Sequence, residues 1–224
     1  MQAGAAYATA RKRLIELMTA ASPDERDQRV PACPDWRTRD VLAHVVGIAV
    51  DTLDGQIAGA GTEEWTERQV DERRDRSVED LVSEWEGVAD RLDAALDTFH
   101  PAIAGGFIGD LVTHEQDVRG ALGKPGGRDD EAFEIALDSY VRFFGRRIKE
   151  NDLPGLVVRS EGREWTLGKN DVVGELSGDP FEVLRSLTGR RTLDQVRALQ
   201  WTTDPEPFLP IVSMYGIPAA PLSE

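Results

Sequence analysis

Asp110 and His114 are the residues whose types and spacing best predict chemistry in this chain. They lie four residues apart in the run from Gly109 to Gly123. If this run is helical, the two side chains project from one face with Cβ atoms about 5–6 Å apart. A carboxylate and an imidazole at that spacing can bind one divalent cation. The chain has only three histidines, and a second one, His44, lies in another apolar stretch with helical period.

His44, Asp110 and His114 together would offer a cation two nitrogens and one oxygen. Such a set suits Zn²⁺ or Ni²⁺, and three protein ligands leave positions open for water or substrate. Asp117 could orient the imidazole of His114, whereas Glu115 points about 100° away on a helix. The residues alone leave a second interpretation open, because a histidine on an apolar helix face is commonly a hydrogen-bonded core or boundary residue.

The hydrophobic pattern predicts the helices that would carry these residues. Thr38 is a candidate N-cap, and Ser77 with Asp80 resembles a capping box. Gly123 followed by Pro125 is typical of a helix C-terminus. Apolar residues recur with helical period in five segments, near residues 5–21, 38–53, 77–99, 107–122 and 130–149. The charged segment 59–76 is expected to be a solvated connection. Long helices with short connections are typical of a bundle.

The pattern changes after residue 151. Two short β-type runs, 156–158 and 165–167, flank Glu161-Gly162 and predict a hairpin, and 172–176 is a further candidate strand. Asp179-Pro180 is expected to begin a helix that ends at Gly189, and 192–199 to form another. We therefore expect an α+β protein with two domains, residues 1–151 and 152–224.

Composition and charge narrow the possible partners. The chain holds 26 basic and 41 acidic residues and has a formal net charge of −15, which opposes binding to a phosphate backbone. No apolar run approaches the length of about 20 residues needed to span a bilayer, and the N-terminus does not resemble a signal peptide. The single cysteine, Cys33, excludes an intrachain disulfide and fits a reducing cytoplasm. We expect a cytoplasmic protein without nucleic-acid or membrane partners.

Three segments resemble the mycothiol-dependent maleylpyruvate isomerase family. The run Pro31–Gly47 resembles its first motif, approximately C-P-x-W-x-x-x-D-x-x-x-H-x-x-G, and Asp110–Gly123 resembles its second. Gly178–Pro180 and Leu187–Arg190 resemble its smaller C-terminal domain. The family belongs to the DinB-like superfamily of metal-binding bundles. The resemblance therefore implies a DinB-like four-helix bundle over 1–151 and a small α/β domain over 152–224.

The resemblance also implies roles for single residues. His44 and His114 match the histidines of the two motifs, and Asp110 stands where the family often has glutamate. Aspartate is one methylene shorter but can still bind a metal, so the Asp110–His114 pair supports metal binding more firmly than any particular reaction. Arg190 matches a C-terminal arginine, for which the resemblance implies a place at the substrate or thiol end of the cleft. The alternative role for Arg190 is that of a cation at a helix C-terminus.

These observations lead to a metal-dependent enzyme as the main hypothesis. It would use mycothiol as a cosubstrate and act on a small electrophilic substrate as a transferase or isomerase, in a monomer or homodimer. One alternative is a non-enzymatic, metal-binding DinB-like protein without thiol transfer. Another is a purely structural metal, which would need four protein ligands where the sequence offers three good ones. Because Cys33 lies in a turn without a neighbouring histidine, we do not expect it to be a nucleophile.

Overall fold

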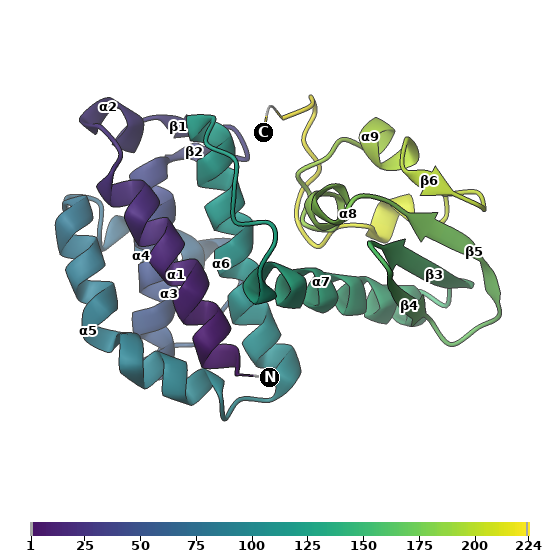
Figure 1. Ribbon diagram of the computed structural model, residues 1–224, viewed down its shortest axis with the longest axis horizontal. Helices are drawn as coiled ribbons and strands as arrows, with labels where there is room; N and C mark the ends of the chain where they lie inside the picture. Colours follow the sequence, from purple (N-terminus) through teal and green to yellow (C-terminus); the bar gives the residue numbers. More distant parts are fainter. Residues whose placement is uncertain (1, 223) are drawn as a thin grey trace. The chain divides into compact units, whose positions relative to one another are not determined.

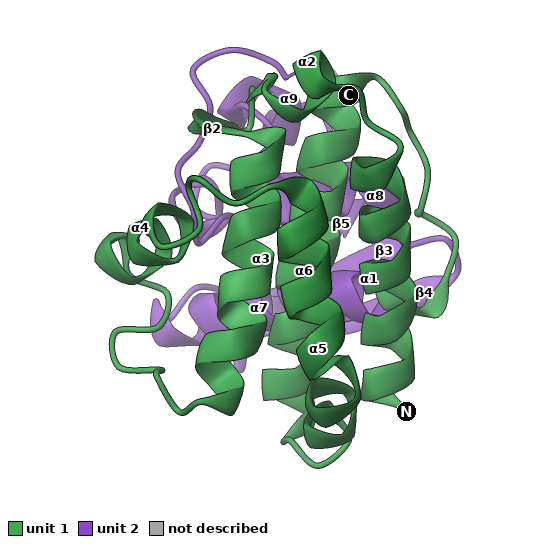
Figure 2. Ribbon diagram, turned by 90° about the vertical axis from the view of Figure 1, so that its left-hand side faces the viewer, with its two compact units in different colours: residues 1–132, 224 green, residues 133–223 purple. Residues whose placement is uncertain are grey.

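The computed structural model of the chain describes residues 2–222 and 224. The chain forms two compact units, one of residues 1–132 with residue 224 and the other of residues 133–223 (Figure 2). The division between the units falls near the start of the helix predicted at 130–149, whereas the change in composition placed the domain boundary after the end of that helix. The proposed domains, 1–151 and 152–224, thus differ from the compact units in where they place that helix.

The first unit is built around four long helices, which Figure 1 shows side by side. α1 contacts α5 and α6, and α3 contacts the same two helices, so the apolar faces meet in one core. Leu14, Leu42, Trp85 and Ile108 are buried there, one from each helix. The predicted helical bundle is confirmed. The four helices are α1 (Ala3–Thr19), α3 (Thr38–Leu53), α5 (Val78–Leu96) and α6 (Pro101–Leu122).

Short elements connect these helices. α2 (Pro23–Arg26) is followed by an antiparallel pair of strands, β1 (Arg29–Val30) and β2 (Cys33–Arg37), which leads directly into α3. A further helix, α4 (Glu63–Asp71), lies within the segment that we expected to be a charged connection. That expectation was wrong, because α4 turns Trp65, Gln69 and Val70 into the protein and leaves its charged residues outside.

The start of α3 differs in one respect from the sequence expectation. The N-cap is Arg37, whose backbone N–H donates to the Asp40 carboxylate at 2.8 Å, while Asp40 occupies the first turn as expected. The Thr38 hydroxyl instead donates to the Glu25 carbonyl at 2.7 Å, which ties α3 to α2. The Ser77–Asp80 capping box at the start of α5 is confirmed.

Helix α6 is longer than the sequence pattern predicted. It begins at Pro101, with the imidazole of His100 accepting the backbone N–H of Ala102, so the predicted start near Phe107 was wrong. Proline fits the first position of a helix, and the small residues that follow carry little hydrophobic periodicity. The helix ends as predicted at Gly123, whose φ of 62° lies in the left-handed region.

The second unit combines helices with a four-stranded sheet in the order β4-β3-β5-β6. β3 and β4 form the predicted antiparallel hairpin, and β5 runs parallel to β3. The indole N–H of Trp165 donates to Asp138 at 2.8 Å and joins β4 to α7. Most of α7 belongs to this unit. Its elements are α7 (Glu131–Glu150), β3 (Gly155–Ser160), β4 (Arg163–Leu167), β5 (Val172–Ser177), α8 (Pro180–Leu187), α9 (Leu193–Arg197), β6 (Gln200–Trp201) and the 3-10 helix η1 (Leu209–Ile211).

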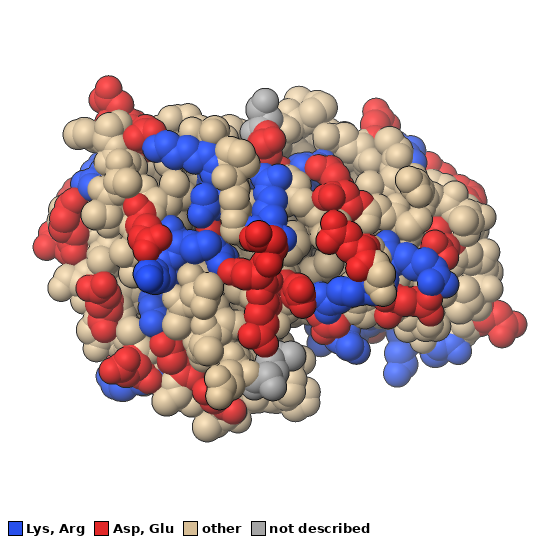
Figure 3. All heavy atoms as spheres, viewed as in Figure 1, with Lys and Arg blue, Asp and Glu red and all other residues tan. Residues whose placement is uncertain are grey.

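The surface carries many ion pairs despite the acidic balance. On the face in Figure 3, Lys and Arg side chains lie among Asp and Glu side chains. Examples are Arg26 with Glu79, 2.8 Å apart, and Lys124 with Glu25, 2.5 Å apart. Within the described residues, no helix has the length and apolar content needed to cross a membrane.

Candidate metal centre

The packing of α3 against α6 brings His44, Asp110 and His114 to one point. Nε2 of His114 lies 3.6 Å from Oδ1 of Asp110, and Nε2 of His44 lies 4.0 Å from Oδ2 of the same carboxylate. The two imidazole rings are 5.0 Å apart between centroids and nearly perpendicular, at 85°. One ligand atom of each residue lies within 4.8 Å of the others. Three side chains predicted from sequence thus share one site.

This site is buried on the histidine side and partly open on the carboxylate side. The side chains of His44 and His114 are 5% and 10% exposed, whereas that of Asp110 is 25% exposed. The carboxylate is therefore the part of the site that solvent reaches most, while the protein surrounds the two imidazoles. Burial also strengthens the electrostatic interactions among these groups, because little water screens them.

His44 is held as a neutral imidazole. Its Nδ1 lies 2.8 Å from Oε1 of Gln69, and the side-chain N–H of that amide donates to Asp51 at 3.0 Å. Since the Gln69 oxygen accepts, Nδ1 of His44 carries the proton and Nε2 keeps its lone pair toward Asp110. Burial lowers the pKa of His44 to about 4 in spite of the opposing charge of Asp110. At neutral pH this nitrogen is available to bind a cation.

His114 has a different electrostatic setting. Its Nδ1 lies 3.1 Å from Oδ2 of the buried Asp117, the orienting contact expected from sequence. Burial on its own would lower the pKa of His114, but the charge of Asp110 and the hydrogen bond to Asp117 outweigh it and raise the pKa to about 10. The two carboxylates therefore favour a positive charge at this place. A divalent cation would satisfy the same preference once the His114 proton leaves.

Strand β2 adds two residues that sequence reasoning had left outside the site. The Trp36 ring lies 5.0 Å from the His44 ring and 6.1 Å from the His114 ring, between centroids. The Cys33 thiol donates to Oδ2 of Asp117 at 3.7 Å, and Cys33, His114 and Asp117 form a second group with metal-ligand geometry. The sequence pattern did not single out Trp36, and it showed no histidine next to Cys33 in the turn. Their place immediately before α3, in the same motif as His44, was the available signal.

The remaining candidates lie elsewhere. Glu115 is fully buried and forms ion pairs with Arg13 at 2.7 Å and Arg119 at 2.9 Å, in keeping with its expected direction away from the ligands. His100 is the N-cap of α6, and its side chain accepts from the backbone N–H of Ala102. Arg190 is buried in the second unit, where it donates to the Thr188 carbonyl at 2.5 Å beyond the end of α8.

The fold and this group of side chains define the class of protein. It is an α+β protein with a DinB-like fold, in which a helical bundle brings two histidines and a carboxylate together. The family model of the mycothiol maleylpyruvate isomerase N-terminal domain matches residues 7–119, half of the chain. The chain belongs to this family.

Two solved structures share the fold. A histidine-to-alanine mutant of the mycothiol-dependent maleylpyruvate isomerase is 12% identical, with a TM-score of 0.56, over 89% of this chain and 91% of that chain. Another crystal structure described as mycothiol-dependent maleylpyruvate isomerase is 13% identical, with a TM-score of 0.54 and the same coverage. No curated protein matches the chain in sequence. At these identities the likeness establishes the shared fold.

Proposed function

We propose that this protein is a metal-dependent enzyme that uses mycothiol as its thiol cosubstrate and acts as a transferase or isomerase on a small electrophilic substrate. One observation carries the proposal. Both histidines of the site have Nδ1 engaged by a neighbour, so both direct Nε2 toward the Asp110 carboxylate. Membership of the family supports the choice of thiol, because the family is named for mycothiol.

The donor set fits a divalent cation. Ligand atoms about 2.1 Å from a tetrahedral Zn²⁺ lie about 3.4 Å from one another. The distances of 3.6 and 4.0 Å from the two Asp110 oxygens to the imidazole nitrogens are near this value, and one ligand atom of each of the three residues lies within 4.8 Å of the others. The shorter aspartate side chain thus reaches both histidines. Two nitrogens and one oxygen favour Zn²⁺ or Ni²⁺ and leave a position open for an external ligand.

The residues around the site have separate roles in this proposal. A bound cation would supply the acidity that makes the mycothiol thiol a nucleophile at neutral pH, able to attack an electrophilic carbon. Asp117 holds His114 in the ligand orientation, and Gln69 does so for His44. The Trp36 ring packs beside both imidazoles. We propose Arg190 as a contact for an anionic group of the substrate. Its hydrogen bond to the Thr188 carbonyl supports the alternative role, that of a cation at a helix C-terminus.

The proposal includes the setting in which the protein works. We expect a cytoplasmic enzyme, monomeric or homodimeric, whose partners are the thiol and the small substrate. The single cysteine supports a reducing compartment. The net charge of −15 argues against nucleic acid as a partner.

Metal analysis of the purified protein tests the site. Wild type should carry stoichiometric Zn²⁺ or Ni²⁺, and His44→Ala and His114→Ala should each lose it. His100→Ala is the matched control, because His100 caps α6 outside the site. Wild type without stoichiometric metal would refute the proposal.

A cobalt-substituted sample tests the use of the thiol. Adding mycothiol should produce a sulfur-to-cobalt charge-transfer band in wild type and in His100→Ala. An unchanged spectrum from a protein that does bind metal would favour the non-enzymatic, metal-binding alternative over the enzyme.

A further inference from the structure

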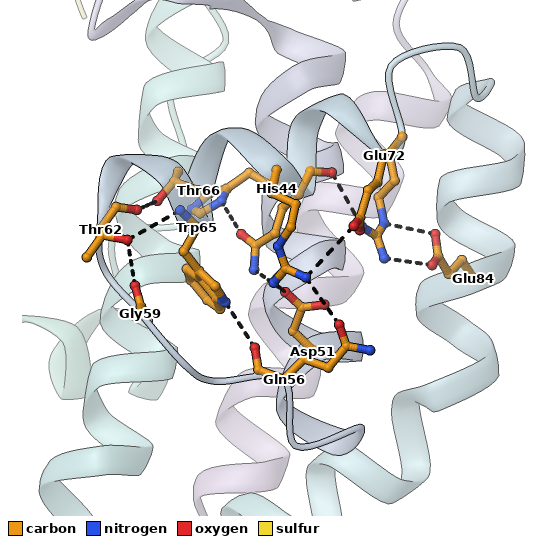
Figure 4. Close-up of polar contacts among 12 residues, drawn as sticks. His44, Asp51, Gln56, Gly59, Thr62, Trp65, Thr66, Glu72 and Glu84 are labelled. Carbon is orange, nitrogen blue, oxygen red and sulfur yellow. Dashed lines mark hydrogen bonds and ion pairs between the residues drawn. The ribbon is translucent and has the colours of Figure 1, made fainter.

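Helix α4 contributes to a series of hydrogen bonds that ends at His44 of the candidate metal centre (Figure 4). Gln69 is fully buried, and its Oε1 lies 2.8 Å from Nδ1 of His44. Its amide N–H donates to Oδ2 of Asp51 at 3.0 Å, and the same oxygen accepts from Arg68 at 3.0 Å. Asp51 is itself only 3% exposed. These hydrogen bonds therefore link the partly exposed guanidinium of Arg68 to the His44 imidazole through the buried Asp51 carboxylate and the buried Gln69 amide.

The donors and acceptors in this series of hydrogen bonds are satisfied by only one orientation of the Gln69 amide. If the Gln69 amide were flipped, its oxygen would face the Asp51 carboxylate, and two acceptors would meet without a proton between them. Its nitrogen would then face Nδ1 of His44, and Nε2 would have to carry the imidazole proton. Asp51 prevents this flip, since it accepts hydrogen bonds and has none to donate. The carboxylate thereby determines which ring nitrogen of His44 holds the proton.

Gly47 allows this arrangement by its lack of a side chain. A Cβ at position 47 would lie 2.6 Å from Cβ and 2.8 Å from Cγ of Gln69, closer than real Cβ contacts. Gly47 follows His44 by three residues and so lies on nearly the same face of α3. The glycine of the H-x-x-G sequence therefore lets α4 come near enough for the amide to reach the imidazole.

We propose that Gln69 is a positioning residue that fixes the tautomer of His44, with Asp51 setting the direction of its amide and Gly47 admitting it to α3. The inference rests on the proposed function in one respect, namely that the free Nε2 of His44 binds a cation. Neighbours that orient a metal-binding histidine in this way commonly change metal affinity 10–100-fold when they are removed. Gln69 touches neither metal nor substrate, so it acts through His44 alone.

The tautomer can be measured in the metal-free protein by nitrogen NMR of the imidazoles, and the chain has only three histidines to assign. Wild type should show His44 with the proton on Nδ1. Gln69→Leu should show a mixture of tautomers or the Nε2–H form, and about 10–100-fold weaker Zn²⁺ binding. Thr66→Ala is the matched control, because the Thr66 hydroxyl donates to the carbonyl of Thr62, the N-cap of α4, on the same helix as Gln69.

A reversed pair separates positioning from general packing. In Asp51→Asn the amide at position 51 can accept as well as donate, so the Gln69 amide can take either orientation, and His44 should show both tautomers and bind Zn²⁺ more weakly. Adding Gln69→Glu places a carboxylate, which can only accept, between this amide and Nδ1 of His44, so the double variant should restore the Nδ1–H tautomer. Rescue by the pair is not expected of a residue that merely fills space.

The outcomes distinguish this inference from the proposed function. An Nε2–H tautomer in wild type, an unaltered tautomer in Gln69→Leu, or no rescue in the double variant would overturn the role of Gln69. If the tautomers behave as expected but wild type binds no cation, the positioning role holds and the metal-dependent function fails. If Gln69→Leu does not fold, the comparison of Asp51→Asn with the double variant decides the question.

Discussion

Gly47→Ala should destabilise the protein although alanine is the better helix former. Gly47 is buried in the middle of α3, and the new methyl would lie 2.6 Å from Gln69 Cβ, about 0.8 Å short of ordinary contact. Overpacking of this kind costs about 1–3 kcal/mol. The gain in helix propensity returns about 0.8–1.0 kcal/mol. We therefore expect a net loss of about 1 kcal/mol and a displaced Gln69.

Gly87→Ala is the matched control. Gly87 lies within α5 and is exposed, and a methyl group there would meet no atom within 4 Å. Its replacement should raise stability by about 0.5–1 kcal/mol, because it gains propensity without a clash. Urea unfolding followed by tryptophan fluorescence and circular dichroism measures both variants. If Gly47→Ala proves as stable as Gly87→Ala, then α4 does not approach α3 at Gly47 and the reasoning about Gln69 loses its support.

Three further changes test other parts of the structure. Glu115→Gln should cost about 3 kcal/mol in urea unfolding, because it leaves the partly buried Arg13 without a full counter-charge; a cost near zero would show that the pair is dispensable. Burial raises the pKa of the Asp40 carboxyl, but Arg37 outweighs it and holds that pKa below its usual value. Asp40→Asn should thus cost about 1 kcal/mol at neutral pH, a difference that shrinks as pH falls below about 4; a pH-independent difference would contradict this origin. Cys33→Ser should keep stoichiometric metal, since the proposed ligands are His44, Asp110 and His114 and a serine hydroxyl can replace the thiol as donor to Asp117; loss of metal would make Cys33 a ligand.

Local signals in the chain predicted most long helices. The capping box at Ser77, the left-handed Gly123 and the apolar stripe of α5 depend on residues within a few positions of one another. The start of α6 was predicted near residue 107 instead of Pro101, because the small residues after Pro101 carry little hydrophobic periodicity. Helix α4 was missed because a short charged helix owes its stability to tertiary packing, which periodicity does not record.

The sequence by itself determined the Asp110–His114 pair, because side chains four residues apart on a helix face the same way wherever that helix packs. The sequence also singled out His44, on a second predicted helix and in the first family motif, without showing that it meets the pair. Only the tertiary structure placed the three within 4.8 Å of one another, since this distance depends on how α3 packs against α6. It also placed Gln69, Trp36 and Cys33 beside the histidines, because these contacts depend on how separate elements pack. The proposed ligands on α6 follow from local spacing, and the protonation and orientation of the histidines follow from packing.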